Sequence, residues 1–433
     1  MNVPVQAHIP VAAPHTLRVT GQDGPTAMLT NRDIVCVSTI DWDFLWQSHQ
    51  AIMAILARNG NRVLFIENTG VRPPGARDLP RLLRRLWKWT RGAGRFRPVM
   101  DNISVFSPLA LPFPYAPLAQ RLNRAFVCRK VRHWLDRRQC SRPILFSFLP
   151  TQFTLDLMDT LAPAVSVYYC TTNFAATSVP ARQIVPYEQR VIERSDLVFA
   201  SAHELLERCR RHNPNVHLFP IGVSLEQFEA AWHGAGSVPA DLAPLQRPIA
   251  GYVGGLHRWL DQPLIRELST QMPEVSFVLV GPAQTSLTCL QGLPNVHLLG
   301  VKPHADLQHY IQHFDVCLIP YVLDTFTHSV CPAKLHEYLA LGKPVVSSDL
   351  PEVRQCNHVH GNVVATATGV DDFRARIAEA LRDHAPHHRA QRRAVAQRHT
   401  WWNTVEAMSH LIAARLLEKQ RHSLPHVEAQ LLS

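Results

Sequence analysis

The stretch CPAKLHEYLALGKPVVSSDLPE, Cys331–Glu352, has the pattern of a helix followed directly by a strand. Pro332 suits the first turn of a helix, because that position needs no backbone N–H. Gly342 ends the helix, since glycine readily adopts the backbone conformation found just after a helix. The β-branched run that starts at Val345 then predicts a strand. A helix leading into such a strand is one step of the alternation that builds a parallel β-sheet.

Lys334 and Glu337 lie three residues apart and therefore on one face of this helix. Backbone N–H groups and the positive end of the helix dipole meet at a helix N-terminus, so a phosphate can bind there. Lys334 adds a positive charge, and Glu337 can accept two hydrogen bonds from the vicinal hydroxyls of a ribose. The spacing alone equally fits an i, i+3 pair on a solvated surface.

Strand-length apolar runs alternate with helical segments on both sides of this stretch. The predicted strands span 34–38, 63–67, 103–106, 144–148, 166–170, 197–201 and 216–220 in a first series and 249–253, 276–281, 296–299, 316–320, 345–348 and 363–365 in a second. This alternation predicts an α/β protein of two Rossmann-like, doubly wound domains that face each other across a cleft. Ligands of open parallel sheets bind beyond the carboxyl ends of the strands, so functional residues are expected on the loops that follow them.

Composition also divides the chain into segments. The Gly-, Pro- and Ala-rich segment 230–248 lacks a hydrophobic period and is predicted to be an interdomain linker. We expect a loose leader at 1–30, the first domain at 31–229 and the second at 249–397. The apolar spacing within 398–433 predicts a long C-terminal amphipathic helix.

A second candidate binding loop follows the first strand of the second series, in IAGYVGGLHRWLD, Ile249–Asp261. Gly254 and Gly255 allow the backbone to approach a ligand closely, and Arg258 can bind an oxyanion through two hydrogen bonds. A Gly-Gly pair after a strand is also common in a tight turn. The segment has neither the Walker spacing nor G-x-G-x-x-G.

The overall composition excludes several classes of protein. The 433 residues are 46% hydrophobic and 18% charged, which excludes a disordered chain and a collagen. The nine cysteines never form a C-x2-C pair, so reduced thiols of a cytoplasmic protein are expected. No secretory signal and no uninterrupted apolar run of about 18 residues is present. The net charge of +10 favours a polyanionic partner or surface.

Several motifs together resemble GT-B fold glycosyltransferases of the group 1 (family 4-like) type from bacterial polysaccharide biosynthesis. They are the GGL after the first strand of the second half, VLVGP in its second strand, IPY after Asp315, and P-x-K-x-x-E-Y-x-A-x-G-K-P-V-V. In the first half, DWDFLWQSHQAIMAILARNGNRVLFIENTGVRPP and SDLVFASAHELLERC with NVHLFPIGVSLEQF resemble passages of the same proteins. The similarity spans nearly the whole chain.

The resemblance implies a nucleotide-sugar donor bound by the carboxyl-side domain. By position, Glu337 would hold the ribose hydroxyls, and Gly254, Gly255, Arg258 and Lys334 would lie near the diphosphate. Many members carry a second glutamate eight residues earlier, in E-x7-E. This chain has Ser329 there, so the resemblance does not extend to the identity of the donor sugar.

Glycosyl transfer passes through an oxocarbenium-like state as a nucleoside diphosphate leaves, so positive groups must stabilise the leaving charge. Arg258, Lys334 and backbone amides can do this without a metal, and we expect no metal and no cofactor besides the nucleotide-sugar co-substrate. Asp43, in the DWD of the first domain, is a candidate acceptor contact. His49 is a candidate general base, although a His on a helix surface is the simpler interpretation. The resemblance favours retention of configuration.

Two basic segments with interleaved apolar residues, 72–97 and 121–138, fall in the first domain. Such segments suit helices that lie on an anionic membrane, and two solvated helices with apolar inner faces are the alternative. Nucleic acid is not expected as a partner, because no motif of a nucleic-acid-binding fold is present.

The sequence therefore predicts a metal-independent glycosyltransferase that acts on a lipid-linked glycan acceptor. It would lie peripherally on the cytoplasmic face of a bacterial inner membrane and serve capsule, exopolysaccharide or lipopolysaccharide synthesis. A nucleotide-sugar 2-epimerase on the same fold and a non-catalytic basic scaffold that binds polyanions are the alternatives.

Overall fold

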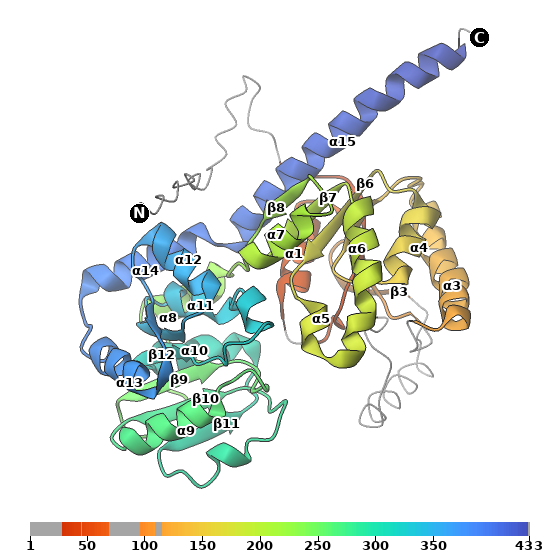
Figure 1. Ribbon diagram of the computed structural model, residues 1–433. Helices are drawn as coiled ribbons and strands as arrows, with labels where there is room; N and C mark the ends of the chain where they lie inside the picture. The colour runs from red at the N-terminus through yellow and green to blue at the C-terminus, as the bar shows by residue number, and fades with distance from the viewer. Residues whose placement is uncertain (1–27, 45, 69–95, 109–114, 432–433) are drawn as a thin grey trace, which may run out of the picture.

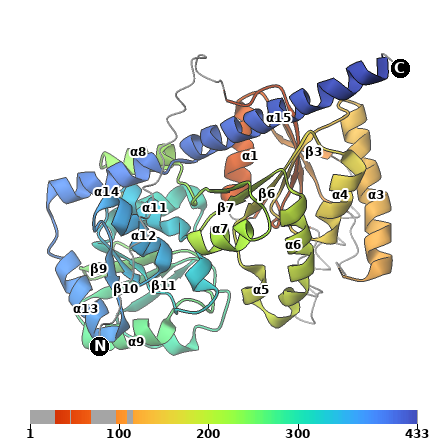
Figure 2. The same ribbon diagram turned by 45° about the horizontal axis from the view of Figure 1, so that its top comes forward.

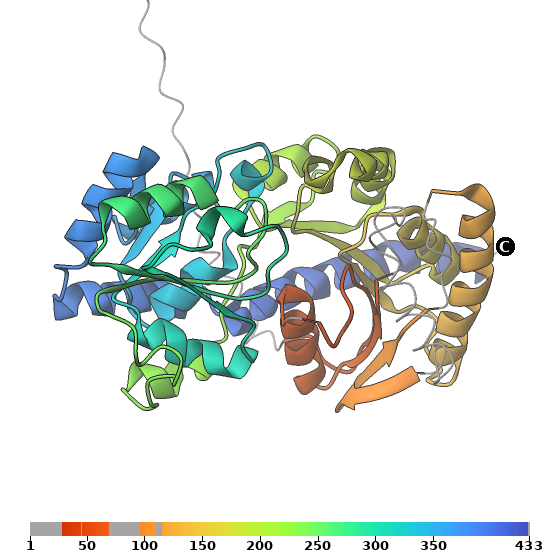
Figure 3. The ribbon, with the colours of Figure 1, turned by 90° about the horizontal axis from the view of Figure 1, so that it is seen from below.

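A computed structural model of the chain describes residues 28–44, 46–68, 96–108 and 115–431 (Figure 1). Most of the predicted leader and most of the basic segment 72–97 lie outside the described residues. The described chain forms two α/β domains side by side, each built on a largely parallel sheet (Figure 3). The predicted fold class is confirmed.

The first domain contains an eight-stranded sheet in the order β3-β4-β2-β1-β5-β6-β7-β8. Its elements are β1 (Asp33–Val37), α1 (Ser48–Arg58), β2 (Arg62–Ile66), β3 (Phe96–Met100), β4 (Ile103–Phe106), α3 (Pro117–Asp136), β5 (Ile144–Ser147), α4 (Gln152–Leu161), β6 (Val165–Cys170), α5 (Phe174–Thr177), η2 (Val179–Ile184), α6 (Val185–Arg194), β7 (Leu197–Ala200), α7 (His203–Arg210) and β8 (Val216–Leu218). All neighbouring strands pair in parallel except β3, which runs antiparallel to β4. Helices cover both faces, so β1 is buried along its whole length.

The second domain contains a six-stranded parallel sheet in the order β11-β10-β9-β12-β13-β14. Its elements are α8 (Leu225–Trp232), β9 (Ile249–Val253), α9 (Gln262–Gln271), β10 (Ser276–Val280), η3 (Thr288–Leu290), β11 (Val296–Gly300), η4 (His304–Asp306), α10 (Leu307–His313), β12 (Val316–Ile319), η5 (Thr327–Ser329), α11 (Ala333–Ala340), β13 (Val345–Ser348), α12 (Pro351–His360), β14 (Ala365–Ala367), α13 (Gly369–Ala380) and α14 (Pro386–Arg398). One continuous apolar core fills this domain.

The chain passes between the domains twice, and the two crossings lie side by side. Val223 donates its N–H to the carbonyl of His399 at 2.9 Å, and the N–H of Trp401 donates to the carbonyl of Val223 at 3.1 Å. The chain therefore first leaves the first domain near Val223, a few residues before the predicted end of that domain at residue 229. The predicted linker 230–248 lies against the second domain instead, because Leu242 is buried in that domain's core.

The C-terminal helix returns to the first domain. This helix, α15 (Trp401–Leu431), runs across the first domain next to α1 (Figure 2). Trp401, Val405 and Met408 are buried in one of the two apolar clusters of the first domain. The first half of the predicted amphipathic helix thus packs against the domain in which the chain began. No described helix combines the length and apolarity needed to span a bilayer.

Candidate functional site

The candidate donor site lies where β9 and β12 are neighbours, which is the point at which the strand order of the second sheet reverses. The connections from these two strands leave in opposite directions, and ligands of doubly wound sheets bind in the space between them. Gly254 directly follows β9, and Tyr321 lies two residues after β12. The predicted loops therefore lie at the place that the topology favours.

Two glycines make a close backbone contact at this edge. Gly254 and Gly281 have φ angles of +141° and +147°, a conformation that side chains rarely permit. A Cβ on Gly281 would lie 1.9 Å from the carbonyl oxygen of Gly254, and a Cβ on Gly254 would lie 3.2 Å from Cε of Lys334. Gly254 of GGL and Gly281 of VLVGP thus allow the ends of β9 and β10 to approach each other and Lys334 to lie close to them.

Lys334 lies in the first turn of α11, and its ammonium faces two tyrosines. Nζ donates a hydrogen bond to the hydroxyl of Tyr321 and lies 5.0 Å and 4.9 Å from the ring centroids of Tyr252 and Tyr321. Both rings attract a cation through their π faces. The structure thus brings Lys334 next to Gly254, at the N-terminus of a helix that carries a partial positive charge.

Glu337 follows one turn later on the same helix and is partly buried. Among the described residues its carboxylate accepts no hydrogen bond. Burial raises the pKa of Glu337, while the nearby His304 and Lys334 act to lower it. His304 is held in place by Gln227, whose side-chain amide donates to the His304 carbonyl at 2.8 Å. An unsatisfied acceptor next to Lys334 suits a ligand that carries hydroxyl donors.

Arg258 and Gly255 also lie beyond β9. The Arg258 guanidinium lies 4.6 Å from the ring centroid of Trp259 and donates to the carbonyl of Thr177 in the first domain at 2.8 Å. The hydroxyl of Tyr252 donates to the carbonyl of Gly255 at 3.0 Å. Arg258 therefore connects the two domains through its contact with Thr177.

The loop between β12 and α11 is held by its own polar side chains. Ser329 is 1% exposed and donates its hydroxyl to the carbonyl of Phe326 at 2.8 Å. The carboxylate of Asp324 accepts from the N–H groups of Phe326 and Thr327 at 2.9 Å and 2.8 Å. The position that is acidic in E-x7-E therefore carries a buried hydroxyl that stabilises the turn.

The structure buries one of the two candidate catalytic residues of the first domain and leaves the other at the surface. His49 is 3% exposed, its Nε2 lies 2.9 Å from the hydroxyl of Thr39, and burial lowers its pKa to about 3. Asp43 is exposed and forms an ion pair with Arg97 at 2.9 Å. Their roles as general base and acceptor contact stay predictions.

A second interdomain contact lies just beyond β7 of the first sheet. The carboxylate of Glu352, in the first turn of α12, accepts from the N–H of His203 at 2.6 Å. The same carboxylate lies 3.1 Å from Nδ1 of His203 and raises the pKa of this imidazole. Together with Arg258 and Thr177, this pair holds the two domains against each other across the cleft.

Four residues to which the sequence assigned no role lie around the predicted site residues. Tyr252 and Tyr321 frame the Lys334 ammonium, and His304 lies near Glu337. His257 faces the ring of Tyr321, and burial together with Lys334 lowers its pKa to about 4. The signal for Tyr321 was present in IPY, because a residue just beyond β12 must reach the switch point.

The helix α3 contains most of the basic segment 121–138. Part of this helix fits the prediction of a membrane contact, and part fits a solvated helix with an apolar inner face. Its inner face carries Val127 and Val131, which are buried in the first domain's core. Near its start, Leu118 and Leu122 are 70% and 52% exposed, and Arg121 is exposed beside them. The middle of α3 thus fits the alternative of a solvated helix with an apolar inner face. The first two turns of α3 instead expose apolar and basic side chains to solvent.

Comparison with known proteins agrees with this geometry. Residues 247–383 match the family model described as glycosyl transferases group 1. A putative teichuronic acid biosynthesis glycosyltransferase, TuaH, of Bacillus subtilis is 29% identical over 226 residues, which are 49% of this chain and 56% of that protein. The chain thus spans a little over half the length of this relative.

Two solved structures share the arrangement of the whole described chain. Sucrose-phosphate synthase from Thermosynechococcus elongatus superposes with a TM-score of 0.66 at 16% identity, covering 90% of this chain and all of that one. HepE of Anabaena, solved with UDP and glucose, gives a TM-score of 0.62 at 15% identity and covers 88% of this chain and all of that one.

The chain therefore has the GT-B fold of these structures. Within its second domain, residues 247–383 are similar to the group 1 glycosyl transferases. The predicted fold and the predicted resemblance to GT-B glycosyltransferases of polysaccharide biosynthesis are confirmed.

Proposed function

We propose that this protein transfers a sugar from a nucleoside diphosphate-sugar to a glycan acceptor in polysaccharide biosynthesis. The observation that carries the proposal is the pairing of Lys334 and Glu337 on one helix, beside Gly254 and at the switch point of the second sheet. A cation at a helix N-terminus suits a diphosphate, and an unsatisfied carboxylate one turn later suits a ribose diol.

In this proposal the donor lies with its diphosphate against Lys334 and the first turn of α11. Gly254 leaves room for the phosphate oxygens, and Glu337 accepts hydrogen bonds from the ribose hydroxyls. The HepE structures contain UDP and UDP-glucose, which supports a uridine nucleotide as the first donor to test.

The reaction breaks the bond between the anomeric carbon and the diphosphate oxygen and forms a bond from that carbon to an acceptor hydroxyl oxygen. The acceptor's proton passes to the departing diphosphate. Lys334 and the helix N-terminus stabilise the negative charge that grows on this leaving group, so we propose that no metal is required. Arg258 adds to this stabilisation when it exchanges its contact with Thr177 for the donor.

We further propose that configuration is retained. Inversion requires a general base opposite the leaving group. His49, the candidate general base, is buried and bonded to Thr39, so it does not stand free to serve as that base.

The proposed acceptor is a lipid-linked glycan at the cytoplasmic face of the membrane. Leu118 and Leu122 expose apolar surface beside Arg121, the combination that binds an anionic bilayer from one side. This helix belongs to the first domain, which would hold the acceptor. The relative TuaH, named for teichuronic acid biosynthesis, supports a role in a cell-envelope polysaccharide.

A thermal-shift screen tests the donor site. The protein is heated with UDP, GDP, ADP and dTDP and with their sugars, because a ligand that binds only the folded state raises the unfolding temperature. We expect a shift with one nucleotide class that is lost in Lys334→Ala and Glu337→Gln and kept in Glu274→Gln, a matched change at an exposed glutamate.

The other outcomes contradict the proposal in distinct ways. No shift with any nucleotide, together with salt-dependent polyanion binding, would favour the non-catalytic scaffold. Conversion of the donor sugar to its 2-epimer without an acceptor would favour the epimerase.

A further inference from the structure

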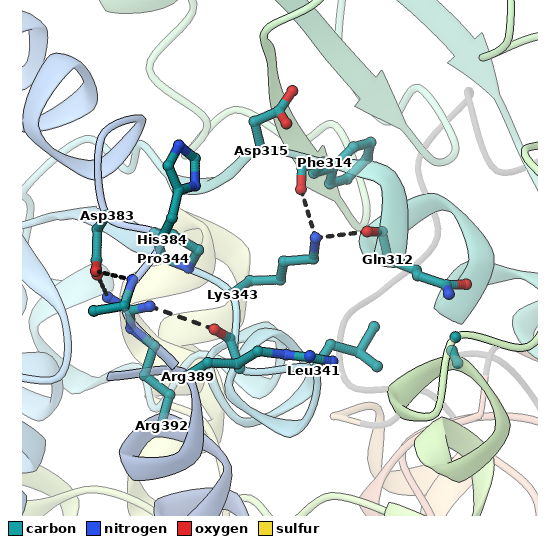
Figure 4. Close-up of a pocket in the computed structure, with 14 residues that line it drawn as sticks. Gln312, Phe314, Asp315, Leu341, Lys343, Pro344, Asp383, His384, Arg389 and Arg392 are labelled. Atoms are coloured by element: carbon teal, nitrogen blue, oxygen red, sulfur yellow. Dashed lines mark hydrogen bonds and ion pairs between the residues drawn. The ribbon is translucent and has the colours of Figure 1, made fainter. Parts of the chain in front are cut away.

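A cavity of about 310 Å³ lies in the second domain, at the edge of the sheet opposite the donor site (Figure 4). Strands β12 and β13 begin there, directly after Asp315 and Pro344, whereas the donor site lies where β9 and β12 end. The helix α11 joins the two places, because Lys334 lies in its first turn and Leu341 follows its last. The cavity is thus separate from the site already described.

Three helices end at this cavity, and a basic side chain binds the carbonyl groups at each end. Nζ of Lys343 donates to the carbonyls of Gln312, in the last turn of α10, and Phe314, just after that helix, at 2.5 Å and 2.7 Å (Figure 4). Arg389 donates to the carbonyl of Trp232 at the end of α8 at 3.0 Å. Arg392 donates to the carbonyl of Gly342, just beyond α11, at 3.4 Å. These contacts fix the cations in place around the cavity.

The charges around the cavity do not balance. Arg392 forms an ion pair with Asp383, and Asp315 forms one with Arg247. In the described part of the chain, Lys343 and Arg389 have no carboxylate partner. Lys343 and Arg389 together carry two positive charges. The C-termini of the three helices contribute roughly −0.5 charge each, so a net charge of about +0.5 remains at the cavity.

Around the cavity, hydrogen-bond donors outnumber the acceptors available to them. An ammonium has three N–H donors and a guanidinium has five. Lys343 uses two of its donors, and Arg389 uses one, for the carbonyl of Trp232. The carboxylate of Asp315 is already occupied by Arg247 and by the backbone N–H of Ile249. The cavity therefore offers several unused donors and few free acceptors, which is the chemistry of an oxyanion site.

We propose that this cavity binds a small phosphorylated molecule. The phosphate would lie between Lys343 and Arg389, where a guanidinium can donate two parallel hydrogen bonds to it. The volume equals roughly that of ten water molecules, more than one phosphate fills. Pro344, which is half-buried, lines part of the rest of the cavity and provides an apolar contact for the organic part of the ligand.

Calorimetric titration of the full chain with inorganic phosphate and with ribose 5-phosphate tests the proposal. We expect both to bind and ribose 5-phosphate to bind more tightly, because its sugar also contacts Pro344. Arg389→Gln and Lys343→Met should each weaken binding by about tenfold or more, the size expected for one hydrogen bond to a charged group. Arg398→Gln is the matched control, since Arg398 lies at the far end of α14, about 14 Å along the helix from Arg389.

The variants separate this site from the proposed donor site. In Lys334→Ala, which weakens any binding of phosphate at the proposed donor site, ribose 5-phosphate should still bind, and adding Arg389→Gln should remove that binding. Binding that is lost in Lys334→Ala and kept in Arg389→Gln would overturn the proposal, because the phosphate would then lie in the cleft. Equal losses in Arg398→Gln and Arg389→Gln, or no binding at millimolar ligand, would also overturn it. If Lys343→Met does not fold, Arg389→Gln decides the question, because Arg389 is exposed.

Discussion

Replacing Glu337 by Gln removes the charge of the proposed ribose ligand and keeps its shape. The carboxylate is partly buried and accepts no hydrogen bond from the described residues. Hydrogen bonds to a charged group contribute about 1.5–3 kcal/mol each and neutral ones about 0.5–1.5 kcal/mol, so two ribose contacts should lose about 2 kcal/mol in total. This corresponds to a Kd for the nucleotide that is roughly 30-fold weaker.

The same substitution should stabilise the protein in the absence of ligand. Burial raises the pKa of Glu337, which means that the folded protein disfavours the charged form at neutral pH. Glu337→Gln should therefore unfold at a higher temperature than the wild type at pH 7.5 while binding the nucleotide more weakly. Glu274→Gln, at an exposed position, should change neither quantity.

The pH dependence provides a further check on this residue. Because the raised pKa brings protonation of Glu337 to a higher pH, the wild type should lose nucleotide affinity as the pH falls through that pKa, above the ordinary value of 4.5. Isothermal titration calorimetry of wild type and Glu337→Gln across this range makes the comparison, and the variant should show the weaker dependence. Equal affinities and equal pH profiles for the two proteins would refute a ribose contact at Glu337.

The remaining predictions concern the backbone, the domain contact and the membrane. Gly281→Ala should destabilise the protein by more than about 1 kcal/mol in chemical denaturation, because a Cβ there would meet the carbonyl of Gly254; a variant of wild-type stability would contradict this contact. The pKa of His203 is raised in the folded protein, so its ion pair with Glu352 contributes fully below pH 6.5 and is lost as the pH rises through the raised value. His203→Gln should therefore open the domains in small-angle X-ray scattering at pH 6 more than at pH 9, and a pH-independent change would argue against the pair. A Leu118→Ser variant should sediment less with vesicles that contain anionic phospholipid, and undiminished binding would exclude this helix as the contact.

The sequence was sufficient to predict the two parallel sheets, because central strands such as β1, β9 and β10 are buried along their whole length and are therefore almost continuously apolar. The edge strand β3, FRPVM, was not predicted, because its arginine and proline do not follow the apolar pattern of a buried strand. An edge strand exposed to solvent tolerates both residues. The linker was also placed differently. Its Gly- and Pro-rich composition resembles an interdomain segment, whereas Leu242 packs in the second core. Composition does not record which surface a loop lies against.

The candidate site was predictable where local spacing decides it. Lys334 and Glu337 lie one turn apart on a helix, so their common face follows from the sequence. The partners of Arg258 were not predictable, because the carbonyl of Thr177 comes from the other domain. The burial of His49 likewise depends on packing against Phe148, which is distant in sequence. Contacts between separate elements required the structure.

The most direct test of the central claim is a crystal structure of the protein with the nucleotide that the thermal-shift screen selects. We predict density for the diphosphate beside Nζ of Lys334 and the first turn of α11, with the ribose hydroxyls in hydrogen-bond range of the Glu337 carboxylate. A nucleotide bound elsewhere, with Lys334 still directed at Tyr321 and no ligand near Glu337, would contradict the claim.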